Sequence, residues 1–113
     1  MIAANELRIG NWVALKDGYF VPIADGGILA INQKRFECYP ISLTPEILEK
    51  CGFVMHKTSQ LWRKDNFYLH HYLVSDNEYC FKYSDFTSSS IQYLHQLQNL
   101  YFALCGEELN YTP

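Results

Sequence analysis

The residues from Ile91 to Leu104 contain no charged side chain, and apolar residues recur among them at the spacing of an α-helix. The apolar stripe consists of Ile91, Leu94, Leu97, Tyr101 and Leu104. Ser89 or Ser90 can cap the start of such a helix, and Gly106 can end it. We therefore predict a C-terminal helix over residues 91–104 that packs its apolar stripe on the rest of the chain.

The opposite face of this helix carries amides and an imidazole where an ordinary helix surface carries lysine and glutamate. We call this set the amide face: Gln92, His95, Gln96, Asn99 and Ala103. Gln98 lies between the two faces, and amides lose less solvation on burial than ions do. Two interpretations stay open. Either the amide face binds a second subunit, a partner protein or a ligand, or the helix lies between two β-layers and bonds to their backbones.

The N-terminal third predicts a small antiparallel β-meander. Asp17 and Gly18 form a turn between two apolar runs, which is a strong hairpin signal. The expected strands are Trp12–Leu15, Tyr19–Ile23, Ile28–Ile31 and Arg35–Tyr39. Their glycine-punctuated turns favour an SH3-like half-barrel, although periodicity does not separate a half-barrel from a flat sheet.

A short helix follows Pro40. Thr44 supplies a hydroxyl cap, Pro45 takes the first helical position, and Gly52 ends the helix. A second antiparallel meander is then expected, with strands at Phe53–His56, Leu61–Arg63, Phe67–Leu73 and Tyr79–Tyr83. Residues 87–90 look like a polar linker to the last helix.

These elements predict an α+β fold with antiparallel β-meanders, one short helix, and one longer C-terminal helix packed on the sheet. A length of 113 residues, with 49% hydrophobic and 19% charged residues, is typical of a single globular domain. We expect one domain over residues 1–113, with a soft joint near residue 40.

The charges are scattered along the chain, and the net charge is −3. Duplex nucleic acid is bound mainly by clustered lysine and arginine, so we expect no duplex partner. The N-terminal residues lack the pattern of a secretory signal, and no apolar run approaches the roughly 20 residues that span a bilayer. We expect a cytoplasmic protein that does not bind membranes.

Neither catalytic nor metal-binding spacing is present. The imidazoles of His56, His70, His71 and His95 follow no ligand motif, and the four cysteines form no CxxC pair. Cys80 and His70 could meet across adjacent strands, although a buried structural thiol is the simpler interpretation. We predict no enzyme activity, no metal and no cofactor.

Aromatic residues make up 16% of the chain, more than one small core needs. Tyr68, His70 and Tyr72 share one face of a predicted strand, and Tyr79 and Tyr83 belong to the next strand. Such a row can stack bases or pack a subunit, unless it is simply the core face. Few basic residues are available for phosphates, and Arg63 is one of them.

Three segments carry a resemblance to a known family: NELRIGNWV at Asn5–Val13, PISLTPEILEKCGF at Pro40–Phe53, and IQYLHQLQNLYFALCGEEL at Ile91–Leu109. The chain resembles a family of small, largely uncharacterised proteins from phages and integrated elements of Bacteroidetes-type bacteria. The resemblance implies no activity and no functional residue. It implies a setting, because small phage proteins are often accessory factors that bind host proteins or nucleotide signals of antiviral defence.

The leading hypothesis is a non-enzymatic binding protein, homo-oligomeric through the amide face or the tyrosine-rich strands, that sequesters a host ligand such as a nucleotide immune signal. The alternative is a protein-interaction or assembly factor without a small ligand. The candidate ligand or interface residues are Gln92, His95, Gln96, Asn99, Tyr68, His70, Tyr72 and Arg63.

Overall fold

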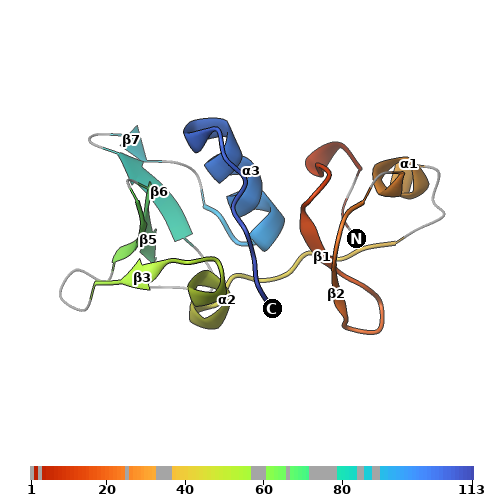
Figure 1. Cartoon of the computed structure of the whole chain (residues 1–113), viewed down its shortest axis with the longest axis horizontal. Coiled ribbons are helices and arrows are strands. Elements are labelled where there is room, and N and C mark those ends of the chain that lie inside the picture. Colours follow the sequence, from red (N-terminus) through yellow and green to blue (C-terminus); the bar gives the residue numbers. More distant parts are fainter. Residues whose placement is uncertain are drawn as a thin grey trace.

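The chain folds into two antiparallel sheets with helix α3 between them (Figure 1). The computed structural model describes residues 2, 4–24, 26–32, 37–56, 61–65, 67–71, 79–83, 86–87 and 90–113. The elements in chain order are η1 (Ala4–Glu6), β1 (Trp12–Ala14), β2 (Phe20–Pro22), α1 (Gly27–Asn32), α2 (Pro45–Lys50), β3 (Val54–Met55), β4 (Leu61–Lys64), β5 (Phe67–His71), β6 (Tyr79–Tyr83), β7 (Phe86–Thr87) and α3 (Leu94–Cys105). The predicted α+β class is confirmed.

The N-terminal hairpin forms as its turn residues predict. β1 and β2 pair antiparallel with Val13 opposite Val21, and Gly18 takes a left-handed φ of +92° in the turn between them. On its other edge β1 pairs with Tyr39, through bonds of 2.9 and 2.8 Å between the backbones of Ala14 and Tyr39. Both edges of this short strand are therefore occupied.

The strand predicted at Ile28–Ile31 is wrong, because these residues belong to helix α1. A short apolar run does not distinguish a buried strand from a buried helix, and Tyr39 already takes the free edge of β1. Ile31 instead packs into a small cluster with Leu7 and Val13. The described N-terminal residues thus form a hairpin and a helix rather than an SH3-like half-barrel; residues 33–36 lie outside the described residues.

Helix α2 begins and ends at the predicted residues. The Oγ1 of Thr44 accepts a hydrogen bond from the backbone N–H of Ile47 at 3.2 Å, and Pro45 is the first helical residue. Gly52 follows the helix with a left-handed φ of +93°. Ile47 and Leu48 are buried, so this helix covers one end of the larger core.

The second sheet has the order β3-β4-β5-β6-β7, and all neighbours are antiparallel. The predicted meander is confirmed. Phe67 and Leu69 of β5 are buried on its inner face, with Trp62 opposite Leu69. Strand β7 was not predicted, because a two-residue strand carries too little pattern to be seen. Tyr72 and Leu73 lie outside the described residues.

Helix α3 starts at Leu94, three residues later than predicted, because the residues before it pair with strands. Ile91 and Tyr79 exchange two backbone hydrogen bonds of 2.6 and 2.9 Å, and Tyr93 forms a bridge to Ser42. Gly106 ends the helix in the left-handed conformation, as predicted.

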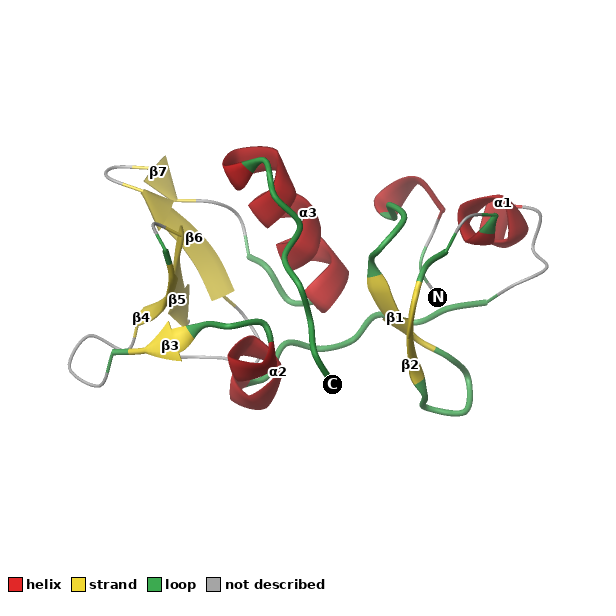
Figure 2. Cartoon of the chain, in the orientation of Figure 1, coloured by secondary structure: helices red, strands yellow, loops and turns green. Residues whose placement is uncertain are grey.

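The apolar stripe of α3 packs on the inner face of the second sheet. Leu94 and Leu97 are fully buried, and the ring of Tyr101 lies 5.1 Å from that of Phe67. Leu104 is 52% exposed, so its predicted place in the buried stripe is wrong. Figure 2 shows the same helix with strands on both sides. In the described ranges, no helix has the length and apolar character needed to cross a membrane.

We expect Leu97→Ala to lower the free energy of unfolding by about 2–5 kcal/mol, because it leaves a cavity between α3 and the sheet. Leu104→Ala is the matched control, since the same change at an exposed position of the same helix should cost less than about 1 kcal/mol. Urea unfolding followed by circular dichroism measures both variants. Equal losses would contradict the packing described here.

Candidate functional site

The amide group of Gln98 joins α3 to the N-terminal hairpin and to the C-terminal tail. Its Oε1 accepts a hydrogen bond from the backbone N–H of Trp12 at 2.8 Å. Its Nε2 donates to the carbonyl oxygens of Gly10 at 3.2 Å and Leu109 at 3.4 Å. Gln98 is 1% exposed, so these groups have no access to water. The side chain therefore bonds to three backbone groups, and these bonds pair its own buried amide.

Asn99 makes a second set of contacts to the same N-terminal segment. Its Oδ1 accepts from Arg8 Nε at 2.8 Å and Asn11 Nδ2 at 2.9 Å, and its Nδ2 donates to the carbonyl of Glu6 at 3.0 Å. Arg8 also pairs with Glu108 at 2.7 Å and lies over the Phe102 ring. This arginine is thus held by internal contacts.

Gln96 acts at the start of α3. Its Oε1 accepts hydrogen bonds from the backbone N–H groups of Gln92 at 3.0 Å and Tyr93 at 3.2 Å, just ahead of the first helical turn. Gln96, Gln98 and Asn99 therefore all bond within their own chain. Of the two interpretations of the amide face, these bonds favour a helix that lies between two layers and satisfies their backbones.

His95 is the unusual member of the amide face. It is 2% exposed, its ring stacks on Tyr93 at 6.0 Å, and neither nitrogen has a hydrogen-bond partner among the described residues. The nearest carboxylate oxygen, Glu6 Oε1, lies 3.8 Å from Nε2, beyond hydrogen-bond distance. Burial lowers the pKa of His95, and the Glu6 carboxylate offsets only part of this effect.

The outer face of the second sheet carries the other candidate residues. The cross-strand register places Val54, Arg63 and Tyr68 in one row over β3, β4 and β5. His70 lies two residues further along β5 on the same face as Tyr68, and both are half-buried. The structure therefore brings Arg63, Tyr68 and His70 together, on the opposite side of the sheet from α3.

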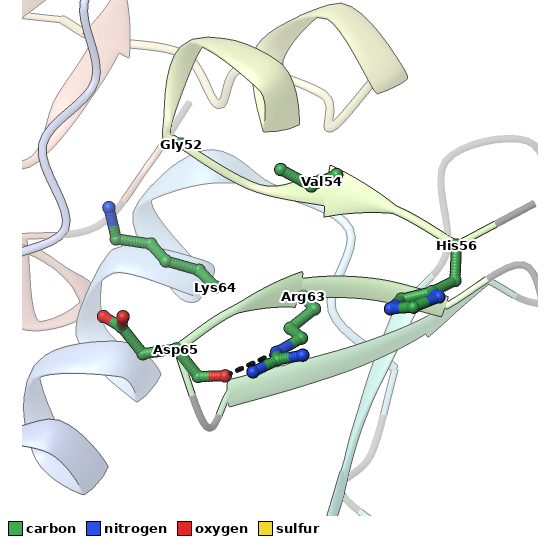
Figure 3. A pocket seen from close by; sticks show the side chains of 6 residues that line it. All are labelled: Gly52, Val54, His56, Arg63, Lys64 and Asp65. Carbon is green, nitrogen blue, oxygen red and sulfur yellow. Dashed lines mark hydrogen bonds between the residues drawn. The ribbon is translucent and has the colours of Figure 1, made fainter.

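Arg63 is held in place by two neighbours. Its Nε donates to the backbone carbonyl of Asp65 at 2.9 Å, and its guanidinium lies 5.8 Å from the centre of the Tyr68 ring. The carboxylate of Asp65 points away from the guanidinium (Figure 3). No described residue accepts a hydrogen bond from the two Nη groups, and the side chain is exposed. Both Nη groups are thus available to an anion.

A surface cavity of about 380 Å³ adjoins Arg63 (Figure 3). It is lined by Gly52, Val54, His56, Arg63, Lys64 and Asp65. His56 and Lys64 were not predicted as site residues. One signal could have indicated His56. It lies two residues after Val54 on the expected strand, so the two side chains share a face, and the register pairs Val54 with Arg63.

The remaining aromatic candidates are either buried or outside the described residues. Tyr79 is fully buried in the larger core, so of the two alternatives for its row the core face holds. Tyr72 lies outside the described residues, as does the side chain of Tyr83. The outer aromatic surface that the structure describes therefore consists of Tyr68 and His70.

The pKa values of Cys38, Cys51 and Cys105 are raised, which disfavours the thiolate. Cys38, Cys51 and Cys80 are buried, as predicted, whereas Cys105 is exposed, and all four are free. Burial raises the pKa of Cys51 to about 12, and burial together with Glu107 raises the pKa of Cys105. Cys80 lies opposite His70 in the sheet register, as predicted, but it is 2% exposed. No cluster of three His, Cys, Asp or Glu side chains occurs among the described residues.

The comparisons with known proteins give no family to which this chain can be assigned. No protein-family model matches the sequence, and neither a curated protein nor a solved structure matches it significantly. The function must therefore be argued from the outer sheet face and its cavity.

We expect Gln98→Met to lower the free energy of unfolding by at least about 2 kcal/mol, because methionine keeps the volume but removes three hydrogen bonds to buried or part-buried backbone groups. Glu49→Met, at an exposed position of α2, should change it by less than about 0.5 kcal/mol. Chemical denaturation measures both. A loss at Gln98 no larger than that at Glu49 would show that these hydrogen bonds do not hold α3 to the hairpin.

His95 should make stability depend on pH. Because its pKa in the folded chain is lowered from 6.5, the unfolded chain takes up a proton first as the pH falls. The stabilising contribution is complete above pH 6.5 and is lost as the pH falls below it towards the folded pKa. His95→Phe should remove this part of the pH dependence in denaturation curves between neutral pH and mild acid. Superimposable profiles for the two proteins would contradict a buried neutral imidazole.

Proposed function

We propose that this chain is a non-enzymatic binding protein whose ligand is a small anion with a planar ring, of the nucleotide type. The ligand lies on the outer face of the second sheet, beside Arg63, Tyr68 and His70. The observation that carries the proposal is the guanidinium of Arg63, which is fixed between a carbonyl and an aromatic ring while its two Nη groups face no described acceptor.

A guanidinium held in a fixed orientation binds an anion more tightly than a mobile guanidinium does. The Nε bond to Asp65 sets the plane of the guanidinium, so less side-chain freedom is lost when an anion binds. Phosphate and carboxylate oxygens match the paired N–H groups of arginine. The site therefore favours a phosphate- or carboxylate-bearing ligand over a neutral one.

The neighbouring rings supply the second half of the recognition. Tyr68 and His70 are half-buried on the same face, and the guanidinium lies 5.8 Å from the centre of the Tyr68 ring. Stacking on an aromatic ring contributes roughly 1–3 kcal/mol per nucleobase and tolerates every base. A nucleotide has both features, because it carries an anionic phosphate and a planar base.

The family resemblance supports a setting for this activity. We propose that the protein is a phage-type accessory factor that sequesters a nucleotide signal of host antiviral defence in the cytoplasm of the host cell. Sequestration requires binding without turnover.

A second candidate is a protein-interaction or assembly factor, including a homo-oligomer. One observation favours it: β3 lies at the edge of the described sheet, and its two side chains, Val54 and Met55, are 68% and 44% exposed. An exposed apolar edge strand can pair with a strand of a second chain. Light scattering tests the homo-oligomeric form of this candidate, which requires a species larger than the monomer.

Isothermal titration with a panel of linear and cyclic nucleotides tests the leading proposal. We expect at least one nucleotide to bind, and Arg63→Ala to weaken it about tenfold or more, because a charge-assisted hydrogen bond is lost. Tyr68→Leu should also weaken binding, since the leucine keeps apolar volume without an aromatic face. Lys16→Ala, an exposed cation in the N-terminal hairpin, is the charge-matched control and should leave the affinity unchanged.

The proposal fails if no nucleotide in the panel binds. It also fails if Arg63→Ala and Lys16→Ala bind equally well, because the anion would then lie elsewhere.

A further inference from the structure

Two separate apolar clusters lie on either side of α3 (Figure 1). The larger cluster joins the apolar stripe of α3 to the inner face of the second sheet. The smaller cluster belongs to the residues before Tyr39, with η1, the N-terminal hairpin and α1, which we call the N-terminal unit. Its buried members are Ile2, Leu7, Val13, Ile23, Ile31 and Cys38.

The contact between α3 and the N-terminal unit is mainly polar. No residue of α3 belongs to the smaller cluster, although Trp12 and Ala14 of β1 pack against the larger one. The described hydrogen bonds across the contact come from Gln98 and Asn99, and from Arg8 on the other side. Breaking this contact therefore leaves each apolar cluster closed, so it costs less than unfolding either of them.

His95 is buried in the same contact. Its Nε2 faces Glu6 of η1, with 3.8 Å between Nε2 and the carboxylate Oε1. One turn further along α3, Asn99 donates to the backbone carbonyl of Glu6 at 3.0 Å. His95 is 2% exposed, and neither of its nitrogens has a hydrogen-bond partner among the described residues. The docking of η1 on α3 thus encloses an imidazole without pairing it.

The charged and titratable groups described at this contact come from three segments. The N-terminal unit supplies the Glu6 carboxylate and the Arg8 guanidinium, and the C-terminal tail supplies Glu108, which pairs with Arg8 at 2.7 Å. Tyr93, just ahead of α3, supplies the hydroxyl of the ring that stacks on the imidazole. Of these groups, Glu6 favours a charged His95.

An imidazolium fits this contact less well than a neutral imidazole. A buried charge needs a close partner or water, and the Glu6 side chain is 52% exposed, so water weakens its attraction for His95. Burial is the larger effect and lowers the pKa of His95. A proton on His95 therefore favours a conformation in which water reaches the ring, and separation of η1 from α3 is such a conformation.

We propose that His95 makes the docking of the N-terminal unit on α3 sensitive to pH. When the imidazole gains a proton in mild acid, the N-terminal unit separates from α3 and exposes the amide face, while the second sheet stays folded. The outer face of that sheet is not involved, so this inference is independent of the proposed ligand.

Hydrogen exchange of the full chain, followed by nuclear magnetic resonance at about pH 7.5 and about pH 5.5, tests the proposal. The N–H of Trp12, bonded to Gln98 Oε1, reports the docking, and the N–H of Tyr79, bonded to the carbonyl of Ile91, reports the second sheet. After correction for intrinsic exchange, we expect acid to lower the protection of Trp12 by up to about tenfold, the limit for one histidine. Because global unfolding also exposes His95, Trp12 must in addition be less protected than Tyr79 by about tenfold or more in acid.

Three variants separate the effect of the proton from a structural effect. His95→Phe should abolish the acid-induced change at Trp12. Glu6→Gln should enlarge it, because it removes the charge that favours the imidazolium. Glu108→Gln is the control: it weakens the same contact through Arg8, so it should lower the protection of Trp12 by a similar factor at both pH values. Each variant is first checked for native circular dichroism at the higher pH.

Equal protection of Trp12 and Tyr79 in acid would overturn the proposal, because only global unfolding would then open the contact. An unchanged acid effect in His95→Phe would also overturn it, as would a smaller effect in Glu6→Gln, since the responsible proton would then bind elsewhere.

Discussion

The side-chain amide of Gln98 is the contact on which the arrangement of the two sheets depends. It bonds to β1 on one side and to the C-terminal tail on the other, within a buried environment where an unpaired backbone group costs roughly 1–3 kcal/mol. The apolar side of the same helix closes the core of the second sheet. Because α3 is packed on both sides, burying a charged residue on its polar face would cost more desolvation free energy than burying an amide.

This constraint is the reason why we place the proposed ligand away from the polar face of α3. Gln96, Gln98 and Asn99 use their amides for the chain's own backbone and for Arg8, so their hydrogen-bonding capacity is largely engaged. On the outer face of the second sheet, the hydrogen bond described for the Arg63 side chain uses only its Nε. Arg63 is the fixed charge of this face, and a surface cavity adjoins this residue. We therefore propose the outer face of the sheet, which carries Arg63, as the recognition surface.

Local patterns in the sequence predicted much of the fold. The cap at Thr44 and the stop at Gly106 act between residues close in the chain, so they can be read directly. Helix α1 was missed because four apolar residues fit a strand equally well until Tyr39 is known to occupy the edge of β1. The cavity could not be predicted, because Lys64 joins it through a carbonyl thirteen residues away rather than by strand alternation.

The most direct test of this account is a nuclear magnetic resonance titration of isotope-labelled protein with adenosine monophosphate. We expect the shifted backbone signals to cluster at the outer face of the second sheet and its cavity, at Val54, His56, Arg63, Lys64 and Tyr68. The signals of Trp12 and Gln98, which report the contact between α3 and the hairpin, should stay in place. Shifts centred on Gln92, His95, Gln96 and Asn99 would contradict it, because they would make the polar face of α3 the binding surface.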